Sequence, residues 1–548
     1  MIPNRRDLLK LSPLAVTAAA STIGRVSLAE APLSPADVAY NVRTFGAAGD
    51  GKTVDTPAIN RAIETVAAAG GGMLVFPAGT YVCFTIRLKS KVDLYLSRGC
   101  IILAADSPKP SEATGYSGGT YDPAGPPQEW ERYQDYGHNH WPNSLFYGEN
   151  LTEISILGPG LIHGKGLSRG GYGDKQPGYF DYVAEQAGVA NKAIALKNCR
   201  NVILRDFSVL HGGHFALLAT GVDTLTLDNL LVDTERDGFD FDCCHNVRVS
   251  NCTVNSPSDD AICPKSSYAL GYARTTENVT ITNCFVTGRY EIGSLIDGTW
   301  KRSRRGRGNG RIKCGTESNG GFRNIAISNC VCEGSRGIAI ETADGAIVED
   351  IVISNITLRD TTDVPVFLRL NRRNRGPAES FRPGSLRRVL ISNVVSYGTS
   401  ALAASILSGI PSNHVQDVKI SNCYFSSTGL PTSIGPGAST TPFPDWHTIQ
   451  VPEMEDGYPE PTLFGPTPSK GFFIRHLKNL EMSHVEVASS APDPRPAFWL
   501  EDVHRADFFA ITAPPQDNFA LRNVSDLRIN WSRAAKDTTL NQVADQLI

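Results

Sequence analysis

The chain has 548 residues, of which 52 are Lys or Arg and 56 are Asp or Glu, so its formal net charge at pH 7 is -4. This balance argues against a general nucleic-acid or membrane-surface binder. Hydrophobic residues make up 41% and charged residues 20%, which is typical of a globular protein and excludes a disordered chain. The length exceeds one ordinary domain, but a repeat architecture can absorb it as a single unit.

The first 31 residues have the layout of a twin-arginine export signal. Arg5 and Arg6 precede an alanine-rich apolar run to about Ala20, and residues 27–31 offer small-residue cleavage sites. A transmembrane anchor is the alternative, but the run is shorter than about 20 residues and contains Ser and Thr. We expect a periplasmic or secreted protein with no membrane partner.

A helix is predicted over residues 56–67. It begins at Thr56-Pro57, has helical apolar periodicity and ends before the glycines at 70–72. A helix in this place would cover the open apolar end of a solenoid.

The rest of the chain repeats a short strand pattern. The segment Asn246–Val254 alternates apolar and polar residues, and copies begin at Asn278, Asn324, Asp350 and Asp417. The spacings between copies begin near 22 residues and lengthen where loops are inserted, and no long amphipathic helix separates the copies. This recurrence predicts an all-β solenoid in which parallel strands of successive coils stack about 4.8 Å apart.

Two residue types hold fixed places in the repeat. The recurrent Asn is expected to form a ladder of side-chain amides at a bend. Four of the 12 cysteines follow it in one register, and we interpret them as small buried residues and not as metal ligands: Cys252, Cys284, Cys330 and Cys423. Whether Cys243 and Cys244 form disulfides stays open. We expect residues 38–548 to be one domain with long loop inserts at about 105–145, 289–310 and 427–470.

Acidic residues gather in two places. The first group is Asp237, Asp240 and Asp242, and the second is Asp259 and Asp260. Alternation places Asp240 and Asp242 on the face opposite the intervening phenylalanines, while Gly238 would permit a turn that aims Asp237 independently. Because Asp237 and Asp259 lie 22 positions apart, or one coil, three carboxylates should converge within about 5–10 Å.

Such a cluster suits acid and base catalysis. Clustered carboxylates repel one another, so at least one should have a raised pKa. One protonated acid beside one ionised base is what glycoside hydrolysis requires. A calcium site and a set of solvated turn acids are the alternatives.

A basic cluster lies between the later repeats. Its members are Lys301, Arg302, Arg304, Arg305, Arg307, Arg311 and Lys313, with Tyr290 and Trp300 nearby. An anionic polysaccharide is a better partner for an exported protein than nucleic acid, because arginine pairs bidentately with carboxylates and aromatic rings suit sugar faces. A solvated, mobile loop is the alternative, since three glycines interrupt the cluster.

The motifs resemble glycoside hydrolase family 28, the polygalacturonase family. The resemblance rests on residues 45–51, 144–150, 237–240 and 259–260 and extends to the repeat at Asp417. It implies a right-handed parallel β-helix and an inverting hydrolase that cuts α-galacturonosyl bonds in pectin. By position it implies that Asp259 is the general acid and that Asp237 and Asp260 activate the water. Inversion needs carboxyl groups about 6.5–9.5 Å apart.

The sequence departs from the family at several positions. Glu235 and Arg236 replace the usual Asn and Thr, Ser258 replaces a Gly, and the family's Gly-His-Gly has no good counterpart. The family's Arg-x-Lys substrate clamp occurs literally as Arg311-Ile-Lys313, but strand context aligns it with residues 339–341. We expect Arg311 and Lys313 to supply the clamp from the preceding coil. The further candidate substrate contacts are Asp240, Lys265, Glu291 and Glu341.

We therefore expect a pectin-degrading glycoside hydrolase, exo-acting on rhamnogalacturonan or galacturonan oligosaccharides because the long inserts could close one end of a cleft. A polysaccharide lyase on the same fold and a non-catalytic solenoid that binds anionic glycans are the alternatives. Because no phosphate-cradling glycine loop and no zinc spacing appear, we expect no cofactor and no metal.

Overall fold

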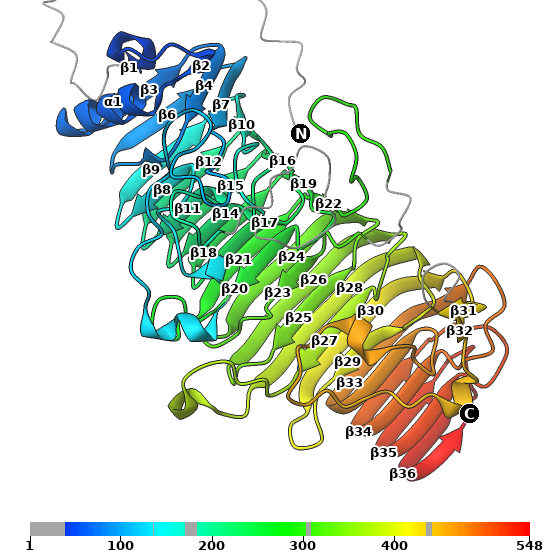
Figure 1. Cartoon of the computed structure of the whole chain (residues 1–548). Coiled ribbons are helices and arrows are strands. Elements are labelled where there is room, and N and C mark those ends of the chain that lie inside the picture. Colours follow the sequence, from blue (N-terminus) through cyan, green and yellow to red (C-terminus); the bar gives the residue numbers. More distant parts are fainter. Residues whose placement is uncertain (1–38, 135, 170–183, 303–307, 435–440) are drawn as a thin grey trace, which may run out of the picture.

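A computed structural model of the chain describes residues 39–134, 136–169, 184–302, 308–434 and 441–548. The export signal predicted over residues 1–31 lies outside these residues. Within them, 34 strands join into one continuous sheet that winds into a right-handed parallel β-helix, as the sequence repeat and the resemblance predicted (Figure 1). No helix in the described part of the chain has the length and apolar character that crossing a membrane requires.

In the middle of the solenoid each coil contributes one strand to each of three faces, so each strand from β3 to β21 pairs with the third strand after it. The first face contains β1 (Ala39–Asn41), β3 (Gly72–Phe76), β6 (Val92–Leu96), β9 (Thr152–Leu157), β12 (Arg200–Arg205), β15 (Asp223–Asp228), β18 (His245–Ser250) and β21 (Thr276–Thr282). The second face contains β2 (Asp50–Val54), β4 (Gly79–Cys83), β7 (Cys100–Ala104), β10 (Leu161–His163), β13 (Ser208–Leu210), β16 (Leu231–Asp233), β19 (Thr253–Asn255) and β22 (Phe285–Thr287).

The third face carries the acidic residues. It contains β5 (Ile86–Arg87), β8 (Phe146–Glu149), β11 (Lys192–Lys197), β14 (Phe215–Thr220), β17 (Asp237–Asp242), β20 (Ile262–Lys265), β23 (Ile312–Cys314), β25 (Ile338–Thr342), β27 (Val366–Leu370) and β29 (Ser405–Ser408). Later strands run around a bend without a break and serve two or more faces: β24 (Phe322–Glu333), β26 (Ile347–Arg359), β28 (Ser385–Thr399), β30 (Val415–Ser427), β33 (Phe472–Ser489), β34 (Phe498–Phe509) and β35 (Phe519–Asn530). The antiparallel β36 (Thr538–Leu547) closes the ladder.

The predicted helix caps the first coil. α1 (Thr56–Ala68) buries Ile59, Ile63 and Val66 in the core and lies across the blue end of the solenoid (Figure 1). Its N-cap residue is Asp55, whose carboxylate accepts hydrogen bonds from the backbone N–H groups of Ala48 and Gly49 and not from the helix itself. The helix thus covers apolar core that an open solenoid end would expose.

The inserts and shorter loops between strands hold short 3-10 helices and one small hairpin. These elements are η2 (Val42–Phe45), η3 (Glu129–Tyr133), η4 (Tyr136–His138), η5 (Ala378–Ser380), η7 (Trp446–Thr448), η8 (Pro461–Phe464), β31 (Ser433–Ile434) and β32 (Thr441–Pro442). The insert over residues 427–470 returns to the third face and reaches the candidate site.

The Asn and Cys ladders are present as the repeat predicted. Asn355 donates its amide to Asn329 at 3.0 Å and accepts from Asn393 at 2.9 Å. Asn355 has φ of 56°, a left-handed conformation that Asn tolerates better than most residues. The four cysteines of the repeat are buried, and all 12 cysteines are free, Cys243 and Cys244 included.

Two substitutions of Asn355 separate the contribution of its amide hydrogen bonds to stability from that of its left-handed backbone. Asn355→Ala should lower the free energy of unfolding by about 1–3 kcal/mol, because it loses two amide hydrogen bonds and places a Cβ in a left-handed backbone. Asn355→Gly keeps the backbone conformation and should lose less. Urea unfolding of both variants measures this, and equal losses would contradict a backbone contribution.

Candidate functional site

Three predicted acids meet at one edge of the third face. Asp237 begins β17, and Asp259 and Asp260 lie in the turn before β20 on the next coil. The backbone N–H of Gly238 donates to the carbonyl of Asp260 at 3.0 Å, which sets the two coils in register. One carboxylate oxygen from each acid lies within 4.8 Å of the others. The 22-residue spacing therefore does bring the three carboxylates together.

Gly238 has a different role from the one that the sequence suggested. It lies inside β17 and does not form a turn. A Cβ at this position would lie 2.3 Å from the carbonyl oxygen of Ala261 and 2.6 Å from a methyl of Val254. The glycine is needed because the next coil approaches closely here, and the turn interpretation was wrong.

The three acids differ in electrostatic environment. Burial raises the pKa of Asp237 well above its usual range, and the charges of Asp259 and Asp240 raise it further. Burial would also raise the pKa of Asp260, but the positive charges of Arg311 and Lys313 outweigh it and lower that pKa to about 2. Asp237 therefore keeps its proton to a higher pH than a free carboxyl does, while Asp260 loses its proton at a lower pH.

Arg236 contacts the most accessible of the three acids. Its guanidinium lies 2.7 Å from the carboxylate of Asp259, whose side chain is 25% exposed, compared with 6% for Asp237 and 3% for Asp260. Arg236 is one of the departures from the family signature, so this substitution acts directly on a site carboxylate. The sequence marked the position but could not show the contact.

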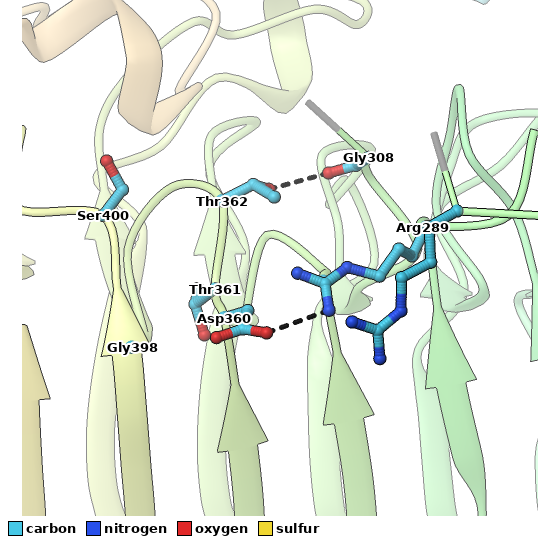
Figure 2. Close-up of a pocket in the computed structure, with 10 residues that line it drawn as sticks. Arg289, Gly308, Asp360, Thr361, Thr362, Gly398 and Ser400 are labelled. Atoms are coloured by element: carbon cyan, nitrogen blue, oxygen red, sulfur yellow. Dashed lines mark hydrogen bonds and ion pairs between the residues drawn. The ribbon is translucent and has the colours of Figure 1, made fainter. Parts of the chain in front are cut away.

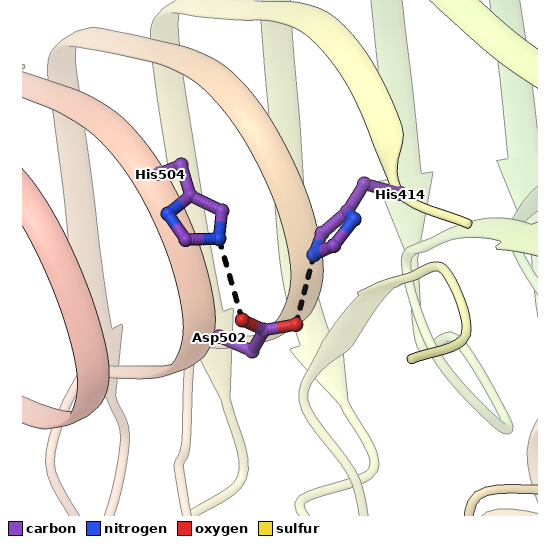
Figure 3. A group of neighbouring side chains, drawn as sticks. All are labelled: His414, Asp502 and His504. Atoms are coloured by element: carbon purple, nitrogen blue, oxygen red, sulfur yellow. Dashed lines mark hydrogen bonds and ion pairs between the residues drawn. The ribbon is translucent and has the colours of Figure 1, made fainter. Parts of the chain in front are cut away.

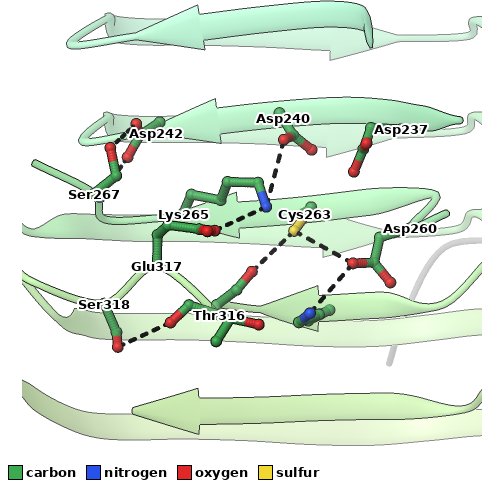
Figure 4. A network of polar contacts seen from close by, with 12 residues as sticks. Asp237, Asp240, Asp242, Asp260, Cys263, Lys265, Ser267, Thr316, Glu317 and Ser318 are labelled. Carbon is green, nitrogen blue, oxygen red and sulfur yellow. Dashed lines mark hydrogen bonds and ion pairs between the residues drawn. The ribbon is translucent and has the colours of Figure 1, made fainter. Parts of the chain in front are cut away.

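A second polar row lies behind the acids (Figure 4). The Nζ of Lys265 lies 3.6 Å from Asp240 and 3.2 Å from Glu317, and all three side chains are buried. Burial raises the pKa of Asp240 to about 8, although Lys265 opposes this. Lys265 and Asp240 therefore contact each other inside the protein, whereas the sequence analysis expected both to contact substrate.

The buried Asp240 makes stability depend on pH. Its pKa is about 8 in the folded chain against an ordinary 3.8, so its favourable contribution is complete below about pH 4 and lost as the pH rises through 8. Within that window, Asp240 should make the free energy of unfolding fall by about 1.4 kcal/mol per pH unit. Asp240→Asn should abolish this part of the fall.

Urea unfolding at several pH values between about 4 and 8 measures this slope. The exposed carboxyl of Asp206 gives the matched control, Asp206→Asn, which should leave the slope unchanged. An unchanged slope in Asp240→Asn would contradict a proton held at Asp240.

The predicted basic cluster divides in the structure. Lys313 lies on β23 and Arg311 directly before it, with exposures of 1% and 2%, whereas Lys301 and Arg302 are exposed in the insert. The other three, Arg304, Arg305 and Arg307, lie outside the described residues. The cluster is therefore not one continuous patch within the described chain, and only Arg311 and Lys313 reach the acids.

The predicted clamp residues are occupied by protein carboxylates. Arg311 donates from Nε to Asp260 at 2.6 Å and from its two terminal nitrogens to Glu460 at 2.8 and 3.1 Å. Arg336 also donates to Glu460, at 2.8 Å. Lys313 reaches the hydroxyl of Tyr458 at 3.2 Å. Glu460 and Tyr458 could not be predicted from the sequence, because single residues in a long loop form no pattern.

The two predicted glutamates differ in burial. Glu341 is fully buried, accepts a hydrogen bond from Thr316 at 3.0 Å and lies 3.8 Å from Lys313. Burial raises the pKa of Glu341 to about 7. Glu291 is half-buried, and no hydrogen bond or ion pair joins it to the acids in the described structure. Glu341 contacts protein groups in this structure, and its contact with substrate stays a prediction.

A pocket of about 320 Å³ is lined by residues of several successive coils, from Gly288 to Ser400 (Figure 2). Arg289 lines it and pairs with Asp360 at 2.9 Å, while the hydroxyl of Thr362 donates to the carbonyl of Gly308 at 2.8 Å. Two residues beyond Gly308, the N–H of Gly310 donates to the carbonyl of Asp259 at 2.8 Å. The pocket therefore adjoins the turn that carries Asp259.

The charges around the three acids favour acid and base chemistry over calcium binding. Three carboxylate oxygens this close could hold a cation. Arg236 on Asp259 and Arg311 on Asp260 already neutralise two of the three acids, however. A cation would have to compete with both guanidinium groups.

Known proteins share this architecture. A family model described as rhamnogalacturonase A/epimerase, pectate lyase-like, matches residues 39–95. A probable polygalacturonase of Vitis vinifera is 26% identical over 331 residues, which cover 58% of this chain and 60% of that protein. The plasmin and fibronectin-binding protein A of Streptococcus pneumoniae is 34% identical over 275 residues, or 47% of this chain and 32% of that protein.

A solved structure supports the fold. The family 28 exopolygalacturonase of Yersinia enterocolitica superposes with a TM-score of 0.55 at 16% identity, covering 87% of this chain and 78% of that one. The chain is thus similar to polygalacturonases of glycoside hydrolase family 28, as its motifs indicated. It spans about 60% of the length of the curated polygalacturonase that it matches.

Proposed function

We propose that this protein is an exported glycoside hydrolase that cleaves α-galacturonosyl linkages of pectin. The observation that carries the proposal is one carboxylate cluster in which the pKa of Asp237 is raised and that of Asp260 is lowered. Such a pair can donate a proton to a leaving oxygen and accept one from water. The similarity to polygalacturonases supports the substrate class.

Two arguments assign catalytic roles to the three acids, and they differ in which acid donates the proton. The family resemblance assigns the general acid to Asp259, with Asp237 and Asp260 activating water. Electrostatics favour Asp237 as the proton donor, because burial and two neighbouring acids keep its proton on. Both assign Asp260 to the base, which Arg311 and Lys313 hold in its ionised form.

We also propose an inverting outcome, which rests on the resemblance alone. The acid oxygens approach within 4.8 Å of one another. This is shorter than the separation of about 6.5–9.5 Å between carboxyl groups that usually leaves room for water in inverting enzymes. Spacing therefore does not support inversion, and the anomer released must decide it.

Exo action on oligosaccharides is supported by the long insert over residues 427–470. It brings Tyr458 and Glu460 onto the third face, where Glu460 holds Arg311 as a galacturonate carboxylate would in a clamp. This side of the site is thereby occupied by protein. A site closed on one side favours chain ends, and a remodelled clamp favours rhamnogalacturonan over plain polygalacturonan.

Export is proposed on the twin-arginine segment at Arg5 and Arg6. The 12 free, buried cysteines are compatible with it, because twin-arginine export carries folded proteins and needs no disulfides on arrival.

A non-catalytic binding solenoid is the second candidate. It is favoured by the partial match to a plasmin and fibronectin-binding protein and by the missing family histidine. Buried acids that repel one another cost stability, and a binder has no need of them.

The test is a proton NMR time course on rhamnogalacturonan oligosaccharides ending in galacturonic acid, with galacturonan oligosaccharides in parallel. Early release of free β-galacturonic acid supports an inverting exo-hydrolase, and the Asp260→Asn variant should release none. Release of the α-anomer would overturn inversion, and shorter oligosaccharides without monosaccharide would overturn exo action. An unsaturated, ultraviolet-absorbing product would indicate a lyase, and intact substrates that still bind would indicate a binder.

A further inference from the structure

A second cluster of titratable side chains lies far along the solenoid from the acids. His414 precedes β30, and Asp502 and His504 lie on β34 (Figure 3). The register aligns Val415 with Leu477 and Leu477 with Val503. His414, His476 and Asp502 therefore stand at equivalent positions on three successive coils, stacked about 4.8 Å apart.

The donor atoms converge within the range of a single metal ion. One nitrogen from each of His414 and His504 and one oxygen of Asp502 all lie within 4.8 Å of one another. His414 Nε2 lies 2.8 Å from Oδ2 of Asp502, and His504 Nε2 lies 3.4 Å from Oδ1. The side chains are 13%, 21% and 43% exposed for His414, Asp502 and His504, so an ion can enter from solvent.

Neighbouring side chains orient these donors. The hydroxyl of Ser525 lies 2.9 Å from Nδ1 of His504, which directs the Nε2 of that ring toward Asp502. Asn523 donates to Oδ1 of Asp502 at 3.0 Å. His476 bonds Asp502 through Nδ1 at 2.8 Å and Glu453 through Nε2 at 3.1 Å, so both of its nitrogens are committed. Such outer partners are typical of metal sites.

We propose that His414, Asp502 and His504 bind one divalent transition-metal ion of the zinc class, with water completing the coordination. Two imidazole nitrogens and one carboxylate oxygen are a donor set that zinc accepts, whereas calcium and magnesium prefer oxygen alone. The ion replaces the imidazole–carboxylate contacts that now join the three side chains.

The site joins parts of the chain that the solenoid alone does not link. It ties the turn before β30 to β34, two coils further on. Through His476 it also connects to Glu453, in the insert that carries Glu460. Metal binding should therefore stiffen that insert. The proposal is independent of the reaction at the acids.

The test uses the full chain stripped of metal and dialysed against limiting Zn²⁺, with bound zinc measured by mass spectrometry. One equivalent is expected to remain. His504→Gln and Asp502→Asn should lose it, and Ser525→Ala should bind about 10- to 100-fold more weakly. His447→Gln is the matched control, because His447 pairs with one exposed carboxylate, Asp445, at 2.7 Å.

Two controls distinguish loss of zinc binding from unfolding and from changes at the acid cluster. Circular dichroism establishes that each variant is folded, and His504 is exposed enough for its replacement to be tolerated. Asp259→Asn should retain the zinc, which separates this site from the acid cluster. No zinc on the parent protein above the level of His504→Gln would overturn the proposal, and so would a loss confined to Asp259→Asn.

Discussion

Replacing Asp237, Asp259 or Asp260 by asparagine is expected to lower kcat/KM by about 10²–10⁴-fold on a pectic oligosaccharide. The reason is that each acid either transfers a proton or keeps the charges of the other two in balance, and an amide can do neither. Initial rates of galacturonic acid release measure the loss. Asp526→Asn, which changes an exposed acid on a distant coil, should leave the rate unchanged.

The same variants identify the proton donor. An aryl α-galacturonide has a leaving group that needs little protonation, so a variant lacking only the general acid should recover most of its rate on that substrate. Electrostatics predict this recovery for Asp237→Asn, and the family resemblance predicts it for Asp259→Asn. Asp260→Asn should remain inactive on both substrates. Recovery in Asp260→Asn would contradict both assignments.

Arg311→Met is expected to lower the free energy of unfolding by about 3–5 kcal/mol, because it leaves the buried carboxylates of Asp260 and Glu460 without their main partner. It should also raise the pKa of Asp260. Since Asp260 acts ionised, the acid limb of the pH–rate profile should move to higher pH. Urea unfolding and kcat/KM against pH measure the two effects.

The matched control for Arg311 is Arg302→Met. Arg302 pairs with Glu333 at 3.1 Å but is 57% exposed, so its loss should cost about 0–1 kcal/mol and leave the pH–rate profile in place. Equal destabilisation by the two variants would contradict the buried network. If the acid limb of the pH–rate profile does not shift in Arg311→Met, Asp260 is not the base.

The fold was predictable because its information is local and periodic. A coil of about 22 residues repeats the same strand alternation, and at one bend Asn355, itself left-handed, joins Asn329 and Asn393 of the neighbouring coils. The helix at 56–67 carried its own start and stop signals and was confirmed with an end at Ala68. Each of these features depends on neighbours within one or two coils.

The site was predictable only in part. Asp237 and Asp259 lie one coil apart, so counting residues sufficed to place them together. The same counting gave Arg311 and Lys313 a common strand face but could not show that protein carboxylates already hold them. Gly238 was misread because close approach of the next coil is a property of packing and not of the strand pattern.

The sequence by itself determined the solenoid, its capped first coil and the meeting of three acids, because all of these follow from a regular period. Only the tertiary structure decided which charges face each acid. Glu460 reaches Arg311 across 149 positions and Asp502 reaches His414 across 88, and no period connects residues separated by irregular inserts. Protonation follows burial and nearby charge, so the chemistry of Asp237 and Asp260 depends on contacts that exist only in the folded chain.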